Sequence, residues 1–183
     1  GEILHGLMLN YPSPSAGTAP TLDTLDLPGA AALLLDDPDG DRRLLAWHRA
    51  DAGDPLPVAA AASGLADASS DGRLALFDAA ADGTLRLAHA EGATRIAYGG
   101  ETVIASDRPA TLALAPEPGG VRAYAGHDGP AVTLGGLGFV PRRVDGACGF
   151  APRPDGSVVV QLNRERRFRL AADRGNARPA ADA

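Results

Sequence analysis

Three histidines are the first residues whose chemistry could serve a site. His48, His89 and His127 each follow a predicted strand, and converging imidazoles would bind zinc or act as an acid–base group. The chain has no HExxH motif and only one cysteine, Cys148, so solvent-exposed strand ends are the simpler interpretation. We assign no catalytic residue, keep His48 as the one candidate because Trp47 beside it offers a flat apolar surface, and predict neither a metal nor a cofactor.

Three aspartates have the alternate-residue spacing of a calcium-binding loop. Asp37, Asp39 and Asp41 fit this spacing, but Arg42 stands where the loop needs glycine and His48 where it needs a bidentate acid. The pattern therefore predicts a solvated hairpin tip.

Residues 135–139 contain the GLGF string found in the carboxylate-binding loops of PDZ domains. In such a loop the following strand offers free N–H groups to a peptide, and here Pro141 removes one of them almost at once. The glycines are better explained by a tight bend of the chain.

The basic residues are unevenly distributed and all are arginine. Between residues 21 and 60 there are eight acids and three arginines, whereas residues 142–178 hold nine arginines and four acids. Arg167 and Arg169 alternate with Phe168 and Leu170, which places both guanidinium groups on the outer face of a predicted final hairpin. Such a row binds carboxylate or sulfate groups, although a solvated strand face docked on the acidic half is the plainer alternative. We therefore predict Trp47, His48, Arg167 and Arg169 as ligand-binding residues.

Composition and missing motifs exclude several classes of function. The net charge of -6 argues against nucleic-acid binding, and no segment approaches the ~18 apolar residues that cross a bilayer. No GxSxG, Walker A or GxGxxG motif occurs, so the chain by itself is not expected to be a complete enzyme. It begins with glycine rather than methionine, which favours a piece of a longer protein.

Asp-Gly pairs and alternating polarity predict an all-β fold. The clearest hairpin spans residues 32–48, and six Asp-Gly pairs separate short runs with period-two alternation. About eleven short strands are expected, a number typical of a β-sandwich, with a curved sheet, a barrel or a β-propeller fragment as alternatives. The expected strands are 31–35, 43–48, 73–78, 84–89, 94–98, 101–105, 110–115, 121–125, 131–134, 157–162 and 166–171. Trp47 ends the most apolar of them and is expected to be at least partly buried.

Changes in composition divide the chain into three parts. Residues 1–20 combine a short apolar segment with a linker rich in Pro and Ser, residues 21–171 form the sandwich domain, and residues 172–183 read as a flexible tail.

The layout resembles the C-terminal β-sandwich of heparinase II/III-type polysaccharide lyases. The resemblance rests on the Pro/Ser-rich segment, the run from Asp23 to Gly29, the strand ending in Trp47-His48 and the later Gly-punctuated strands. In that family an α-helical toroid precedes the sandwich and supplies most catalytic residues, and the sandwich can contribute a histidine, here His48. The resemblance implies an accessory domain of a bacterial polysaccharide-active protein, periplasmic or secreted. Its expected partners are an anionic polysaccharide and an upstream domain of the same polypeptide, with no nucleic acid and no membrane.

Overall fold

The computed structural model describes residues 19–27, 30–48, 56–57, 65, 67–126, 129, 131–164 and 166–172. Within these residues the chain forms β-strands and turns without a helix, which confirms the predicted all-β class. In particular, no helix there is long and apolar enough to span a membrane. Of the expected segments 1–20 and 172–183, all but residues 19, 20 and 172 lie outside the described residues.

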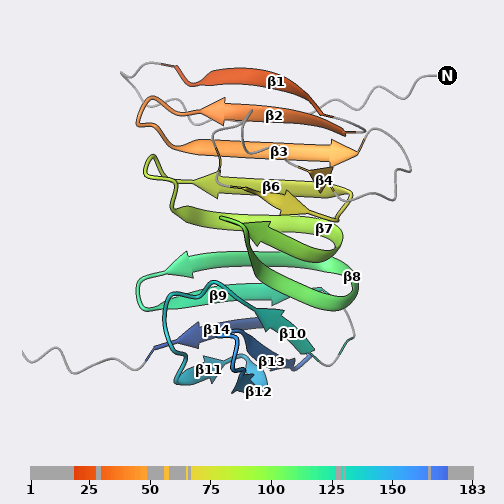
Figure 1. Ribbon diagram of the computed structural model, residues 1–183, viewed down its shortest axis with the longest axis vertical. Helices are drawn as coiled ribbons and strands as arrows, with labels where there is room; N and C mark the ends of the chain where they lie inside the picture. The colour runs from red at the N-terminus through yellow and green to blue at the C-terminus, as the bar shows by residue number, and fades with distance from the viewer. Residues whose placement is uncertain are drawn as a thin grey trace, which may run out of the picture.

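The described residues form fourteen strands of one antiparallel sheet, whereas about eleven strands were expected (Figure 1). They are β1 (Thr21–Leu27), β2 (Ala30–Asp36), β3 (Arg42–His48), β4 (Leu56–Pro57), β5 (Ser69–Ser70), β6 (Leu74–Ala79), β7 (Leu85–Tyr98), β8 (Glu101–Glu117), β9 (Gly120–Ala125), β10 (Ala131–Leu134), β11 (Arg143–Asp145), β12 (Ala147–Pro152), β13 (Val158–Leu162) and β14 (Arg167–Ala171).

The sheet has two arms that share the long strands β7 and β8. The first arm runs β1-β2-β3-β6-β7-β8-β9-β14-β11 and uses the first half of β7 with the second half of β8. The second arm runs β5-β7-β8-β10-β13-β12 and uses the remaining halves, with β4 paired to β5. Each long strand was predicted as two short ones, and that prediction is wrong because the chain bends there without leaving the sheet.

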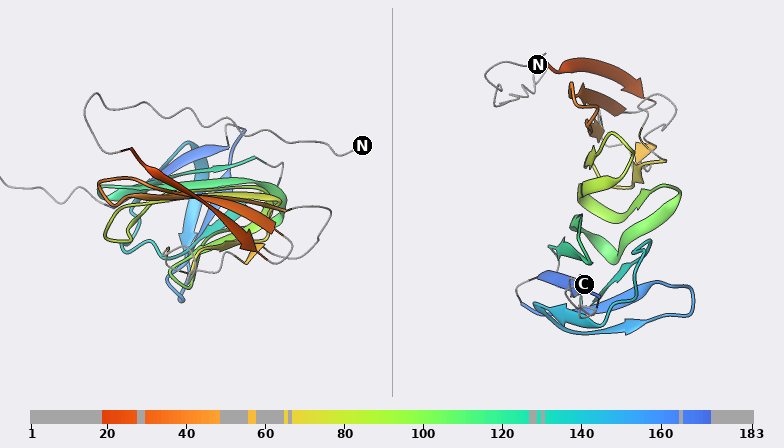
Figure 2. Two further views of the ribbon diagram at one scale, coloured as in Figure 1. Left: turned by 90° about the horizontal axis from the view of Figure 1, so that it is seen from above. Right: turned by 90° about the vertical axis from the view of Figure 1, so that its left-hand side faces the viewer.

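An acidic side chain holds this bend in place. The ladder between β7 and β8 shifts register around Gly92 and Pro109, and Gly92 adopts a positive φ of 65°. The N–H groups of Thr94 and Arg95 each donate to Asp71 Oδ1 at 2.8 Å, and the Thr94 hydroxyl donates to Asp71 Oδ2. The two arms diverge beyond this bend (Figure 2, right). Asp71 therefore supplies acceptors to backbone groups near the bend.

The arms approach each other again at the far end of the molecule. Gly146 separates β11, which pairs with β14 of the first arm, from β12, which pairs with β13 of the second. The strands β13 and β14 follow each other in the sequence but do not pair with each other. The predicted final hairpin is therefore wrong, although both of its strands exist.

The pairing pattern separates the alternatives left open by the sequence. The sheet is not closed, as a barrel would be, and it is not divided into separate four-stranded blades, as a propeller fragment would be. A sheet folded back on itself around one apolar core is the observed architecture. Between the arms the first contributes Leu112, Leu114, Val121, Phe168 and Leu170, and the second contributes Ile96, Ile104, Val132, Leu134, Val158 and Val160.

Candidate functional site

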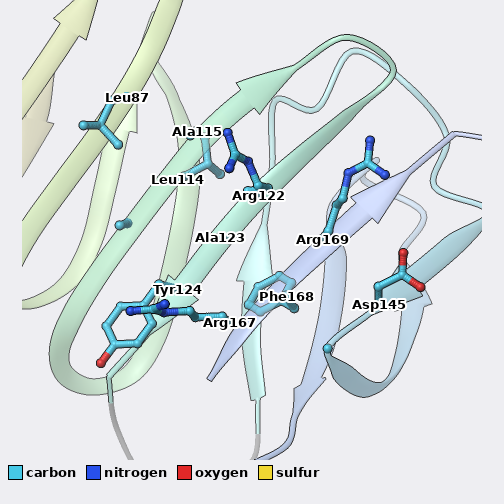
Figure 3. A pocket seen from close by; sticks show the side chains of 12 residues that line it. Leu87, Leu114, Ala115, Arg122, Ala123, Tyr124, Asp145, Arg167, Phe168 and Arg169 are labelled. Carbon is cyan, nitrogen blue, oxygen red and sulfur yellow. The ribbon is translucent and has the colours of Figure 1, made fainter. Parts of the chain in front are cut away.

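An open groove of about 510 Å³ lies on the outer face of the first arm, over β8, β9, β14 and β11 (Figure 3). Arginines from two neighbouring strands border it, and aliphatic and aromatic side chains form much of its surface. Its lining residues are Leu87, Ala113, Leu114, Ala115, Arg122, Ala123, Tyr124, Asp145, Gly146, Arg167, Phe168 and Arg169.

Period-two alternation places the arginines in this groove. On β14, Phe168 and Leu170 are buried in the core, so Arg167 and Arg169 lie on the opposite face, as the sequence predicted. The strand β9 alternates in the same way, and its outward residues Arg122 and Tyr124 stand opposite Arg169 and Arg167 in the ladder.

Two guanidinium groups of the groove share a single carboxylate. Arg122 Nε lies 3.0 Å from Glu117 Oε2, and Arg169 Nε donates to Glu117 Oε1. The Glu117 side chain is 18% exposed, whereas those of Arg122 and Arg169 are 70% and 42% exposed. The Glu117 carboxylate thus orients two guanidinium groups. The three side chains together retain one excess positive charge, which faces solvent.

Arg167 is held by an aromatic ring rather than by an acid. Its Cζ lies 6.0 Å from the centroid of the Tyr124 ring, within the range of a cation–π contact. Arg167 is exposed and forms no ion pair with a carboxylate among the described residues. Its charge is therefore available to an anionic ligand, and Tyr124 provides a flat surface beside it (Figure 3).

The fourth charged residue of the groove already has a partner. Asp145 Oδ1 accepts a hydrogen bond from Arg143 Nε at 2.8 Å.

Three arginines and one aspartate line the groove, which gives the lining two more positive than negative charges. The groove can therefore attract an anion, in a chain whose net charge is -6.

The structure does not bring the four predicted ligand-binding residues together. Trp47 lies on the outer face of β3, between Ala31 of β2 and Leu74 of β6 in the ladder, and is partly buried as predicted. Five strand spacings separate β3 from β14 along the sheet, or roughly 24 Å. Trp47 therefore lies far from Arg167 and Arg169 and does not line the groove.

The histidines are only partly described. His48 is opposite Ala30 in the ladder between β2 and β3, but its side chain and the whole of His127 lie outside the described residues. His89 lies on β7 between Leu76 and Ala113, outside the groove lining. Within the described residues no group of three or more His, Cys, Asp or Glu side chains could hold a metal ion.

The acidic turn between β2 and β3 is a hairpin tip, as predicted. The N–H of Gly40 donates to the Asp37 carbonyl at 2.8 Å, and Gly40 has a positive φ of 87°. Arg43 lies 3.2 Å from an oxygen of Asp37, and Arg86 pairs with Asp41. Arginines thus compensate two of the three aspartate charges that would otherwise attract a cation.

The GLGF segment forms the tight bend expected of its glycines. Gly135 donates its N–H to the Val103 carbonyl at 3.2 Å, and a Cβ at Gly135 would lie 2.4 Å from the Thr102 carbonyl oxygen. Gly136 and Gly138 both have positive φ. Only glycine allows this close approach to β8. The bend and the contact with β8 therefore explain why the segment is rich in glycine.

The groove contains residues that the sequence did not single out. Arg122, Tyr124 and Asp145 line it, and Glu117 holds two of its arginines. The alternation of Val121, Arg122, Ala123, Tyr124 and Ala125 carries the relevant signal, because it predicts an outward Arg-Tyr pair. The missing information was that β9 pairs with β14.

No protein-family model matches this chain, and no curated protein matches it.

Proposed function

We propose that this chain is a non-catalytic accessory β-domain of a bacterial extracytoplasmic polysaccharide-active protein, and that its outer groove contacts an anionic glycan. The excess of guanidinium groups around the apolar groove carries this proposal. The weak likeness in layout to the sandwich of heparinase II/III-type lyases agrees with it, and a parent protein with lyase activity is part of the same proposal.

The groove offers the two kinds of contact that an acidic sugar needs. Arg122 and Arg169 present N–H groups from adjacent strands, and guanidinium groups bind carboxylate or sulfate oxygens with directional hydrogen bonds. Leu87, Ala115 and the Tyr124 ring supply an apolar surface for the carbon face of a sugar ring. The arginines thus bind the acid groups of the ligand, and the sugar ring packs on the apolar surface.

Replacing two arginines of the groove tests the proposal. The variant Arg167→Gln/Arg169→Gln should bind heparin or alginate about tenfold more weakly at low salt, since an exposed ion pair contributes up to about 1 kcal/mol. Calorimetric titration of the whole chain with heparin, alginate and a neutral glucan measures this. Binding of the unmodified chain should also weaken steeply with added salt.

A charge-matched control separates the groove from the net charge. The variant Arg108→Gln/Arg153→Gln removes two exposed arginines that do not line the groove and should bind as the unmodified chain does. Equal loss in both double variants, equal binding to all three polysaccharides, or no binding at all would refute glycan recognition by the groove.

A protein-interaction role is the second candidate, and one observation favours it. Leu33, Leu45 and Leu76 are consecutive partners across β2, β3 and β6 on the outer face, and all three remain partly exposed. Trp47 and Leu74 extend this apolar surface. We propose an upstream domain of the same polypeptide as its partner. Leu45→Ser/Leu76→Ser should then destabilise a longer chain containing that domain more than it destabilises this chain alone.

A further inference from the structure

A second hollow lies between the two arms, on the opposite side of the first arm from the groove. Its volume is about 260 Å³, and both arms contribute to its wall. Four buried aliphatic side chains belong to the lining, which consists of Thr84, Leu85, Tyr98, Glu101, Val103, Leu114, Pro116, Gly120, Val121, Gly135, Gly136, Leu137 and Phe139.

Local backbone features explain why this part of the core is hollow. The ladder between β7 and β8 shifts register at Ile96 and Ala97, so Val103 is an extra residue and both Val103 and Ile104 are buried. Gly120 and Gly135 lie so close to neighbouring carbonyl oxygens that a Cβ would approach within 2.6 Å and 2.4 Å. Both glycines line the cavity, and strand crowding keeps side chains from these two positions.

The wall is apolar and its polar groups are few. Leu85, Val103, Leu114 and Val121 are each less than one tenth exposed. The Tyr98 hydroxyl donates to the Gly83 carbonyl at 2.8 Å and is thereby satisfied without a ligand. The interior consequently suits an apolar group.

The mouth of the cavity carries negative charge. Glu101 is exposed, and its carboxylate has neither a hydrogen-bond donor nor a cationic partner within the described residues. A polar hollow next to the cavity shares Glu101, Gly135, Gly136 and Leu137 with it and adds Asp155. Among the residues that the structure describes, no arginine or histidine lines either hollow.

From this complementarity we propose that the cavity between the arms binds a small molecule with an apolar body and a single ammonium group, which pairs with Glu101. The volume sets the size of the ligand. An engineered apolar cavity of about 150 Å³ accommodates benzene, so the larger space here accepts an aromatic ring with a short chain. This inference is independent of the glycan groove, because the two sites share only the buried Leu114.

Matched ligands test both parts of the recognition. Titration of the whole chain with 2-phenylethylamine and with 2-phenylethanol, followed by methyl NMR, should shift the resonances of Val103, Leu114 and Val121. The amine should bind about fivefold more tightly than the alcohol, as expected for one solvent-accessible ion pair. Glu101→Gln should abolish this preference, whereas Asp39→Asn at the distant hairpin tip should preserve it.

A filling variant tests the location. Val103→Phe should prevent binding of both ligands by occupying the cavity, and Glu101→Gln provides a test that does not alter packing. The proposal is overturned if neither ligand binds the unmodified chain, if the amine and the alcohol bind equally, or if Glu101→Gln retains the preference. It is also overturned if Val103→Phe folds and still binds both.

Discussion

Glu117 shows how a single residue sets the character of the groove. It accepts from Arg169 and pairs with Arg122, so it fixes two long side chains that would otherwise adopt many rotamers. The carboxylate compensates only one of the two charges. An arginine-rich strand face can therefore be ordered without being neutralised, which distinguishes this groove from an ordinary solvated face.

At the same scale, Gly146 is expected to tolerate no side chain. It has a positive φ of 76°, and a Cβ there would lie 2.4 Å from the Arg167 carbonyl oxygen of β14. Gly146→Ala should lower the free energy of unfolding by about 3 kcal/mol or more, because backbone strain and a clash with backbone add together. Urea denaturation measures this change.

Gly83 provides the matched control for that substitution. Its φ of 82° is similar, but nothing lies within 4 Å of the Cβ position. Gly83→Ala should cost only about 1 kcal/mol, the strain of the left-handed conformation alone. Equal losses in the two variants would contradict the argument that close approach to β14 makes Gly146 essential.

At the scale of elements, Asp71 is expected to stabilise the bend of β7. Three donors from Thr94 and Arg95 converge on its carboxylate, and two of them are backbone N–H groups. Asp71→Ala should lower the free energy of unfolding by about 2 kcal/mol, because it leaves the two partly buried donors of Thr94 without an acceptor. Amide hydrogen exchange at Thr94 and Arg95 should accelerate more than exchange elsewhere in β7.

The exposed Asp107, which pairs with its neighbour Arg108, is the control for Asp71. Asp107→Ala should change stability by less than about 0.5 kcal/mol. If both substitutions have the same small effect, the carboxylate of Asp71 does not hold the bend.

Two turns should make the free energy of unfolding depend on pH in the acid range. Asp82 accepts from the N–H of Thr84, and Asp155 accepts from the hydroxyl and the N–H of Ser157; these bonds lower the pKa of both carboxyl groups. A pKa lowered by folding adds stability above the unfolded value of 3.8, and this stability is lost as pH falls through the folded pKa.

Urea midpoints measured from about pH 5 down to about pH 3 test this dependence. The double variant Asp82→Asn/Asp155→Asn should lose less stability over this range than the unmodified chain. An unchanged slope would mean that the two turns do not contribute.

The sequence predicted elements well where local chemistry decides them. Turns are closed by the N–H groups of Gly40, Gly83 and Gly156, as the Asp-Gly pairs suggest. Each N–H donates to the carbonyl oxygen three residues earlier. Gly72 and Gly146 do not close such turns, because their role is to let strands approach each other. An Asp-Gly pair looks the same in the sequence whichever role its glycine has, and only the neighbouring strands distinguish the two roles.

Long-range pairing limited the prediction of the strands and of the site. Two short strands were expected on either side of Pro109, but β8 continues through it, and the ladder with β7 shifts register nearby. Arg167 and Arg169 were predicted from alternation within one strand. Arg122 and Tyr124 entered the site through the pairing of β9 with β14, which separation in sequence conceals.

At the scale of the whole molecule, the shared strands predict one cooperative unfolding transition. A single core cluster extends from Ala30 of β2 to Leu170 of β14, and β7 and β8 belong to both arms. Fluorescence of Trp47, the only tryptophan, reports on β3, whereas far-UV circular dichroism reports on the entire sheet. The two urea curves should coincide. Separate midpoints would show that the arms unfold independently.

The position of β1 also determines how the fold responds to mechanical load. This strand forms one edge of the sheet, whereas β14 lies between β9 and β11 near the opposite end of the stack (Figure 1). A force applied between Thr21 and Ala171 therefore acts largely across the strands and loads their ladder bonds in sequence rather than together. β1 is held by one ladder, with β2, whereas β14 is held by ladders on both sides, with β9 and β11. Tension should therefore peel β1 from β2 before it opens the groove.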